Sequence, residues 1–310
     1  PSFTFIASAN AIAHSGAIPW LFDVEARSWT LDPSQVKKQL ASQTERRGGE
    51  LIHRESGRRV GAIMPVYTLG MPADMDAFRS ISEEFQLPLV ADAAAALGAR
   101  YQERNLGKLA DLTVFSFNGN KTVTCGGGGC VVGEQERLLK RIRHLSTQAR
   151  SGPHYNHDEV GFNCRMTNLQ AAVGCAQLER LEEFVSAKRC IARLYNQAFS
   201  GVPGVGFLPK VTYAESACWF SGITINKPVL KDVSFLCQQM RERGIEGRTF
   251  WKPIHLQGPY GESPFASFNV TEQLWFRILT LPCSTNLTEE NQRKVIDTVS
   301  KLLQNPGKEC

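Results

Sequence analysis

Residues 109–132, LADLTVFSFNGNKTVTCGGGGCVV, join two apolar segments through a polar turn and a run of four glycines. The segments at 109–117 and 127–132 have the composition of buried strands, and residues 87–91 form another such segment before them. A helical pattern at 74–85 precedes this group, and the other elements of the first half also alternate between helix-like and strand-like. This alternation predicts βαβ units around a parallel or mixed sheet.

The elements on either side extend this α/β pattern. Residues 7–15 predict a short helix and residues 18–24 a strand, and Asp32 caps a helix that begins at Pro33. A buried strand is expected at 60–69, and the helix capped by Asp74 places Met75, Phe78, Ile81 and Phe85 at helical spacing.

The second half of the chain has a different pattern. Residues 168–196 predict one long helix, whose buried stripe would contain Leu169, Ala172, Val173, Ala176, Leu181 and Phe184. Short strands, a helix near 233–244 and a closing helix at 289–303 follow. We therefore expect a large domain at 1–167, a connecting helix at 168–200 and a smaller C-terminal α/β domain at 201–310.

Composition excludes several classes of protein. The 310 residues include 35 basic and 30 acidic side chains, and no apolar run approaches the length of a membrane span. Arginines cluster between Arg46 and Arg59 without interleaved aromatic residues, which predicts a solvated basic loop and no nucleic-acid site. Nine cysteines without a C-x-x-C pair predict reduced thiols, with no zinc site or other metal. With no secretory signal visible, we expect a cytoplasmic protein.

The polar turn after residue 117 contains the residues with the clearest chemistry. Ser116, Asn118 and Lys121 follow one strand, and Asp92 follows the neighbouring strand. The glycines precede a strand rather than a helix, which disfavours a dinucleotide site, and no Gly-Lys-Ser/Thr forms a Walker loop. What remains is a lysine beside an anion-holding hydroxyl and an acid, the set that a pyridoxal phosphate enzyme requires. Taken singly, Asp92 could be a helix N-cap and Lys121 a surface lysine.

Several motifs, in order along the chain, resemble those of the DegT family of sugar aminotransferases. They are TFIASANA at 4–11, DAAAALGA at 92–99, FSFNGNK at 115–121, GFNCRMTNLQAA at 161–172, QLE at 177–179 and WKPIH at 251–255. The resemblance runs nearly end to end and implies the fold-type-I aspartate-aminotransferase fold with pyridoxal 5′-phosphate as cofactor. FNGNK at 117–121, STQAR at 146–150 and HY at 154–155 resemble the branch that aminates C4 of UDP-4-keto-6-deoxy-N-acetylglucosamine.

This resemblance implies a role for each candidate residue. Lys121 would hold the cofactor as a Schiff base and then move the proton between the amino donor and the cofactor. Asp92 would keep the ring nitrogen of the cofactor protonated, Phe5 would stack on the ring, and Ser116 would hold the phosphate. Asn163 would reach the phosphate of the neighbouring subunit, which implies a homodimer with shared sites. His255 and Asn118 would contact the sugar nucleotide.

The sequence departs from the family in two places. Ala95 stands where the family usually has a glutamine or histidine that contacts the ring hydroxyl of the cofactor. Family members also have several dozen residues before the motif that begins here at Pro1, including a phosphate-binding turn at a helix N-terminus. The resemblance therefore implies a large domain that is truncated at its N-terminus.

The resulting prediction is transfer of an amino group, with glutamate as the expected donor, to C4 of a UDP-linked 4-keto-6-deoxy sugar. Two alternatives remain open. One is a truncated, non-catalytic paralogue that serves only as a partner subunit. The other is a sugar dehydratase of the same fold, which the presence of Lys121 disfavours because that branch has histidine at this position. The nucleotide, the sugar and the configuration at C4 are not determined by the sequence.

Overall fold

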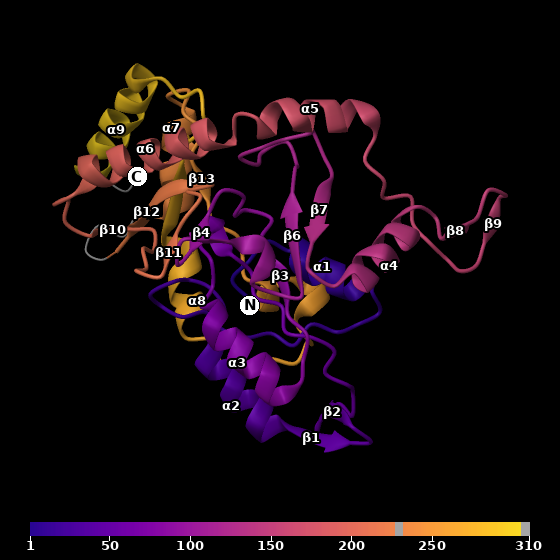
Figure 1. The fold of residues 1–310 in the computed structure, drawn as a ribbon. Coiled ribbons are helices and arrows are strands. Elements are labelled where there is room, and N and C mark those ends of the chain that lie inside the picture. Colours follow the sequence, from indigo (N-terminus) through magenta and orange to yellow (C-terminus); the bar gives the residue numbers. More distant parts are fainter. Residues whose placement is uncertain (227–231, 305–310) are drawn as a thin grey trace.

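The segment quoted above lies in a three-stranded sheet of order β3-β6-β7 in the computed structural model, which describes residues 1–226 and 232–304. Strand β3 (Val90–Asp92) runs parallel to β6 (Leu112–Ser116), and β7 (Gly129–Val132) pairs antiparallel with β6. The expectation of a mixed sheet is confirmed. Because β3 and β6 are parallel, the polar residues that follow them meet at one edge of the sheet (Figure 1).

Helices α1 (Ala7–His14), α2 (Pro33–Gln43), α3 (Met75–Phe85) and α4 (Glu136–Ser146) accompany this sheet. Asp32 caps α2 and Asp74 caps α3 with their side chains, as predicted. The apolar face of α3 is buried in one cluster with residues of β3 and β6, including Phe78, Ala91 and Phe115.

Two predicted strands are wrong in part. Residues 18–24 pair only through isolated bridges at Leu21 and Val24. Residues 60–69 lie beside β3, with bridges at Ile63 and Val66, but form no continuous strand. Pro65 lies between these two bridges and has no N–H to donate, which interrupts the ladder of hydrogen bonds.

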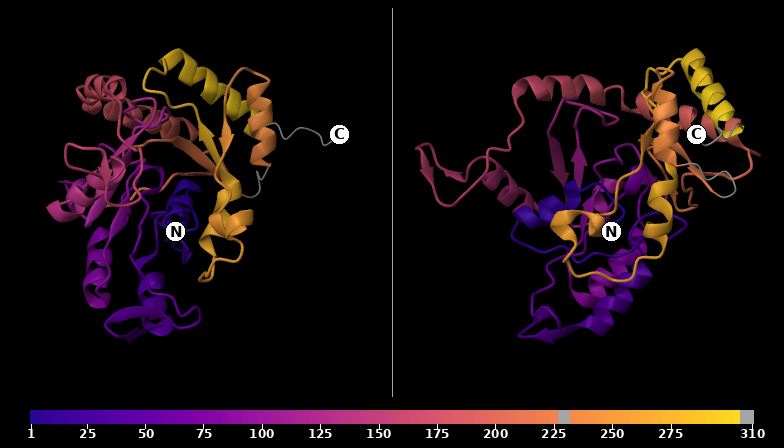
Figure 2. Two further views of the ribbon diagram at one scale, coloured as in Figure 1. Left: turned by 90° about the vertical axis from the view of Figure 1, so that its right-hand side faces the viewer. Right: turned by 180° about the vertical axis from the view of Figure 1, so that it is seen from behind.

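A second, antiparallel sheet has the order β10-β12-β14-β13. Its strands are β10 (Val205–Phe207), β12 (Ser221–Ile225), β13 (Arg248–Thr249) and β14 (Ile278–Leu281). Helices α6 (Leu181–Phe199), α7 (Val233–Arg241) and α9 (Glu289–Gln304) contribute buried residues to the same apolar cluster as this sheet (Figure 2). The predicted helices near 233–244 and 289–303 and the short strands after residue 201 are confirmed.

The remaining elements are short. A hairpin of β1 (Thr44–Arg47) and β2 (Glu50–His53) contains part of the arginine cluster, and a second hairpin joins β8 (Arg150–Ser151) to β9 (Asn156–His157). The others are β4 (Arg100–Tyr101), β5 (Arg104–Asn105), β11 (Ala214–Glu215), α8 (Val270–Leu274) and 3-10 turns at Thr68–Gly70, Leu106–Lys108, Ile254–Leu256, Gly258–Tyr260 and Trp275–Arg277.

The long helix predicted at 168–196 is two helices, α5 (Asn168–Leu178) and α6. The break falls at Arg180, where ψ is 12°, and the predicted buried stripe holds only in α6. Phe184 in α6 is buried, whereas Leu169 and Val173 in α5 are 83% and 49% exposed. The reason is that Phe184 packs against Phe117, Val123 and Cys125 and the later part of α6 packs on the second sheet, while α5 crosses above the first sheet with little of the chain covering its outer side (Figure 1).

Asp23 ties the first segment of the chain to α8. The buried carboxylate of Asp23 accepts three hydrogen bonds from backbone N–H groups of the segment that starts α8. The distances are 2.6 Å from Asn269, 2.8 Å from Val270 and 2.9 Å from Thr271. Replacing Asp23 by alanine removes the acceptor of all three donors and leaves the buried N–H of Thr271 unpaired, so we expect the free energy of unfolding in urea to fall by about 2–4 kcal/mol. The isosteric Asp23→Asn should lose less, and equal losses for both variants would contradict this account.

No helix within the described ranges is long and apolar enough to cross a membrane. The eight cysteines in the same ranges are free thiols, and Cys310 lies outside them.

Candidate active site

The turn that carries Lys121 leaves the carboxyl end of β6. The backbone N–H of Lys121 donates to the carbonyl oxygen of Asn118 at 3.0 Å, and the N–H of Cys125 donates to the carbonyl oxygen of Phe117 at 2.9 Å, closing the loop. Gly126 and Gly128 then take φ values of +75° and +84°, a region that favours glycine. The glycine run therefore makes the tight return from this loop to β7.

Asp92 lies at the end of the neighbouring strand β3 with its carboxylate held on both sides. Oδ2 accepts a hydrogen bond of 2.6 Å from the hydroxyl of Ser8 on α1, and Oδ1 accepts one of 3.0 Å from the backbone N–H of Ala94. No helix begins at Asp92 in the described chain, so the N-cap interpretation is wrong. Each oxygen retains a lone pair for another donor, because a carboxylate offers about four acceptor positions.

The ammonium group of Lys121 lies over an aromatic ring. Nζ is 3.7 Å from the ring centroid of Trp219, and Lys121 forms no ion pair with any described residue. Burial lowers the pKa of Lys121 to about 8, although the negative charge of Asp92 acts to raise it. An amine that is partly buried, unpaired and easily deprotonated can act as a nucleophile near neutral pH.

The lowered pKa gives a testable pH dependence. Only the neutral amine reacts with acylating reagents, so lowering the pKa from 10.5 to about 8 raises the reactive fraction at a given pH below 8. We expect trace acetylation of Lys121 in the cofactor-free protein, followed by peptide mass spectrometry, to rise with pH and level off above about pH 9. A midpoint near the ordinary lysine value would contradict this environment.

Three other predicted site residues lie on the elements that carry or hold Lys121 and Asp92. Ser116 ends β6 and its Oγ accepts a hydrogen bond from the backbone N–H of Asn118 at 3.3 Å. The Asn118 side chain is exposed at the start of the turn. Phe5 precedes α1, the helix that holds Asp92 through Ser8, and its ring is 52% exposed and 5.6 Å from that of Trp251.

His255 lies close to the N-terminal segment but is engaged on all sides. Nδ1 is 2.6 Å from the hydroxyl of Ser2, Nε2 is 3.3 Å from Glu272, and the ring stacks on Phe268 at 3.9 Å. Burial, the largest cause, lowers the pKa of His255, and Glu272 opposes that effect. This geometry gives the histidine a structural role between the chain start and α8, and its contact with a sugar nucleotide stays a prediction.

Asn163 lies on an arm, residues 147–163, that projects from the body of the molecule (Figures 1 and 2). Its side chain is exposed and its backbone pairs with Thr147 at the base of the arm.

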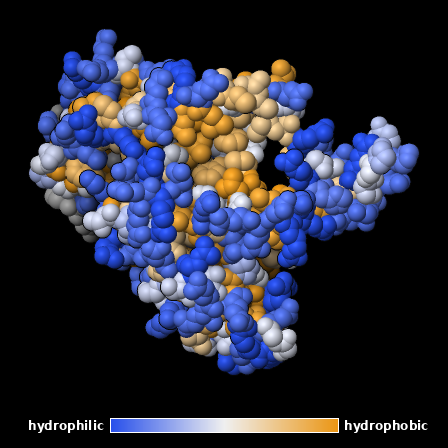
Figure 3. All heavy atoms as spheres, viewed as in Figure 1, coloured by the Kyte–Doolittle hydropathy of each residue, from blue (hydrophilic) through white to orange (hydrophobic). Residues whose placement is uncertain are grey.

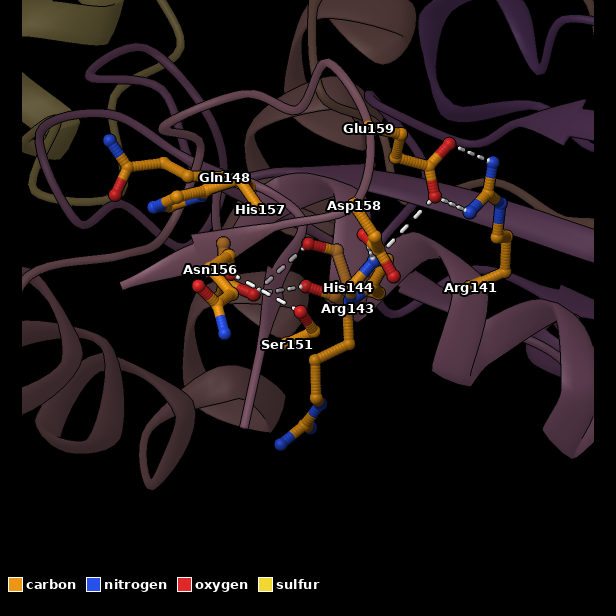
Figure 4. Close-up of polar contacts among 10 residues, drawn as sticks. Arg141, Arg143, His144, Gln148, Ser151, Asn156, His157, Asp158 and Glu159 are labelled. Atoms are coloured by element: carbon orange, nitrogen blue, oxygen red, sulfur yellow. Dashed lines mark hydrogen bonds and ion pairs between the residues drawn. The ribbon is translucent and has the colours of Figure 1, made fainter. Parts of the chain in front are cut away.

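Figure 4 shows how ion pairs from α4 fix the arm: Arg141 binds Glu159, and His144 lies 2.7 Å from Asp158. His144, Asp158 and Glu159 have the donor types of a metal site, but Arg141 already neutralises Glu159.

Sequence reasoning missed two residues that define this site. Ser8 belongs to a quoted motif, but nothing in its spacing shows that it would meet Asp92, 84 residues later. Trp219 lies in the second half of the chain, and no local pattern places it against Lys121. Only the packing of α1 and of the segment before β12 brings these side chains to the carboxyl edge of the first sheet.

Comparison with known proteins yields a consistent set of matches. Residues 1–300 match the model of the DegT/DnrJ/EryC1/StrS aminotransferase family. EpsN of Bacillus subtilis is 34% identical over 306 residues, covering 97% of this chain and 76% of EpsN. GDP-perosamine synthase of Caulobacter vibrioides is 31% identical over 305 residues, covering 98% of this chain and 78% of the synthase.

Solved structures match over the same extent. DesV of Streptomyces venezuelae, solved in complex with a ketimine intermediate, has a TM-score of 0.85 and 30% identity and covers 98% of this chain and 77% of its own. A DegT DnrJ EryC1 StrS aminotransferase from Brucella abortus has a TM-score of 0.86 and 28% identity and covers 98% of this chain and 79% of its own. The fold expected from the sequence is therefore confirmed.

Proposed function

Because the chain belongs to the DegT/DnrJ/EryC1/StrS aminotransferase family of pyridoxal phosphate-dependent sugar aminotransferases, we propose a specific reaction for it. It transfers an amino group from glutamate to C4 of a UDP-linked 4-keto-6-deoxy-N-acetylamino sugar. Family membership accounts for the transfer to a nucleotide sugar. The choice of C4 and uridine rests on the resemblance of residues 117–121, 146–150 and 154–155 to one branch of the family, and glutamate is the expected donor.

The observation that carries the proposal is that Lys121 and Asp92 follow two parallel strands to one sheet edge, where the negative charge of Asp92 acts on Lys121. Pyridoxal phosphate needs an amine to hold it and an acid beside its ring nitrogen. Lys121 is a partly buried amine without an ion pair among the described residues, and Asp92 is a carboxylate held in place by Ser8. When bound, this cofactor supplies an electron sink that lets an amino group pass between two carbon skeletons. The residues of the chain fit the group.

Each residue then has a defined task. Lys121 would hold the cofactor through Nζ, and its amine would move the proton of the amino donor. Asp92, held by Ser8, offers negative charge to a protonated ring nitrogen. Phe5 offers an exposed ring face, and Ser116 offers a hydroxyl to the phosphate at the end of β6.

We further propose that the enzyme is a homodimer with shared sites. In α5 the apolar side chains of Leu169, Val173 and Leu178 are 83%, 49% and 44% exposed. Figure 3 shows apolar side chains gathered over α5 and the strands below it, β6 and β7. A second copy covering this face would remove apolar surface from water and bring the exposed Asn163 near the partner's site.

This proposal predicts the effect of charge on α5. In the double variant Leu169→Glu, Val173→Glu, two carboxylates would have to be buried in the dimer interface, which is unfavourable without cationic partners. We expect light scattering to give the mass of a dimer for the wild type and of a monomer for the variant. The control Lys301→Glu, on the exposed side of α9, should remain dimeric. A monomeric wild type or a dimeric double variant would contradict the proposed interface.

Mass spectrometry of amine transfer tests the proposed reaction directly. The protein, supplied with pyridoxal phosphate and glutamate, is incubated with UDP-, GDP- and dTDP-linked 4-keto-6-deoxy sugars. We expect the amino sugar to form fastest from the UDP-linked N-acetylamino substrate, with release of 2-oxoglutarate. A preference for the GDP- or dTDP-linked sugar would overturn the choice of uridine, and absence of transfer with every sugar would overturn the function.

A further inference from the structure

Trp219 is held in place by contacts on every part of the residue. Its side chain is only 3% exposed and stacks on Phe220 with 3.9 Å between ring centroids. Its indole N–H donates to the carbonyl oxygen of Asn120 at 2.7 Å, beside Lys121. The ring itself lies under the Lys121 ammonium, 3.7 Å from Nζ. One residue thus contacts both the side chain of Lys121 and the backbone of its turn.

The backbone of Trp219 is anchored from α6. The ammonium of Lys188, a buried lysine on α6, donates to the carbonyl oxygen of Trp219 at 3.1 Å, and the thiol of Cys283 lies 3.5 Å from the same oxygen. Cys218, the residue before Trp219, takes a φ of +48°, a backbone conformation that is unfavourable for residues other than glycine. Such strain persists only where the surrounding contacts fix the conformation. The position of the indole is therefore set by α6 and by the segment that carries Cys283.

We propose that Trp219 is a positioning residue for Lys121: its ring holds the free ammonium group, and its indole N–H fixes the turn that carries the lysine. The catalytic meaning of this role rests on the proposed function, since a lysine that alternates between cofactor and proton transfer needs a defined place when released. The contact itself is independent of the reaction. In this way α6, through Lys188 and Trp219, positions the amine in the turn after β6.

The ring and the burial act on Lys121 in opposite directions. Burial in an apolar site disfavours the charged lysine, whereas the face of an indole attracts a cation and favours it. The carboxylate of Asp92 is the ionisable group that acts on Lys121, and its negative charge favours the charged lysine. Removing the ring while keeping the site apolar should therefore favour the neutral amine, and letting water into the site would do the reverse.

Two variants of Trp219 separate the ring face from the indole N–H. Both Trp219→Phe and Trp219→Leu shorten the side chain and remove the N–H donor, but only phenylalanine retains an aromatic face. We expect the pH midpoint for trace acetylation of Lys121 in the cofactor-free chain to be about one unit lower in the leucine variant than in the phenylalanine variant. Equal midpoints, or a higher midpoint for leucine, would overturn the role of the ring.

Hydrogen exchange tests the role of the indole N–H. Both variants lose the bond to Asn120, so exchange of the amides at 118–121 should be about 2- to 10-fold faster than in the wild type. Trp20→Leu is the control, because Trp20 is a partly buried tryptophan that packs on Phe22 and His53, in a different apolar cluster from the rings around Trp219. It should change neither readout. Unchanged exchange in the Trp219 variants, or an equal change in the control, would overturn the anchoring role.

These readouts require neither cofactor nor sugar substrate. If amine transfer fails but the midpoints and exchange rates behave as expected, the proposed reaction is wrong and the positioning of Lys121 by Trp219 stands. If transfer succeeds but the variants leave both readouts unchanged, the reaction stands and the inference about Trp219 is wrong.

Discussion

Lys121→Met is expected to reduce kcat for amine transfer by at least about 10³-fold, because it removes both the proposed attachment point of the cofactor and the proposed proton-transfer base. Methionine has a similar length, and its thioether can pack against the ring of Trp219, so the fold should be retained. The measurement is the steady-state rate of amino-sugar formation, with the urea midpoint determined on the same preparation.

The matched control is Lys108→Met, which removes a lysine that pairs with Glu134 on the surface. An exposed ion pair contributes little to stability, so the variant should stay folded with its active site unchanged. Its transfer rate should therefore equal that of the wild type. If Lys121→Met retained a substantial fraction of the wild-type rate, another amine would have to carry the reaction and the site described here would be wrong.

Asp92→Asn is expected to reduce kcat/KM by about 10²–10³-fold, the usual effect of losing one preorganised electrostatic group. The amide can keep its hydrogen bonds to Ser8 and Ala94, so the loss would reflect the missing charge. Because the charge of Asp92 raises the pKa of Lys121, its removal should also move the acetylation midpoint of Lys121 to lower pH. A shift to higher pH would contradict the electrostatic coupling of the two residues.

Asp111→Asn is the control for replacing a carboxylate near the start of β6. Asp111 accepts hydrogen bonds from the backbone N–H of Leu89 at 2.8 Å and from the side chain of Gln135 at 3.1 Å. It lies at the opposite end of β6 from Ser116, so its variant should change stability without changing the acetylation midpoint of Lys121. Similar loss of kcat/KM in both variants would mean that the effect is structural.

The sequence predicted the parts of the fold that depend on local patterns. Alternation of apolar segments and glycine punctuation placed β6, the Lys121 turn and β7, and the side-chain caps at Asp32 and Asp74 marked the starts of α2 and α3. The parallel pairing of β3 and β6 brings Asp92 and Ser116 to one edge, as expected for α/β sheets. These features can be predicted because they depend only on residues close in the sequence or on one short connection between parallel strands.

Features that depend on distant packing were not predictable. The apolar spacing of α5 indicated a buried stripe, but periodicity cannot distinguish a face buried within one chain from one available to a second chain. The contacts of Trp219 with Lys121 and of Ser8 with Asp92 join residues about 100 and 84 positions apart. His255 carries no local sign that Ser2, Glu272 and Phe268 would engage its ring.

Borohydride trapping shows directly which lysine forms a Schiff base with pyridoxal phosphate. The purified chain is mixed with pyridoxal phosphate, reduced with borohydride, digested and analysed by peptide mass spectrometry. We expect a phosphopyridoxyl group on Lys121, at a yield that exceeds that of every other lysine and is lost in Lys121→Met. A label on other lysines only, or no label at all, would contradict the assignment of Lys121 as the reactive amine.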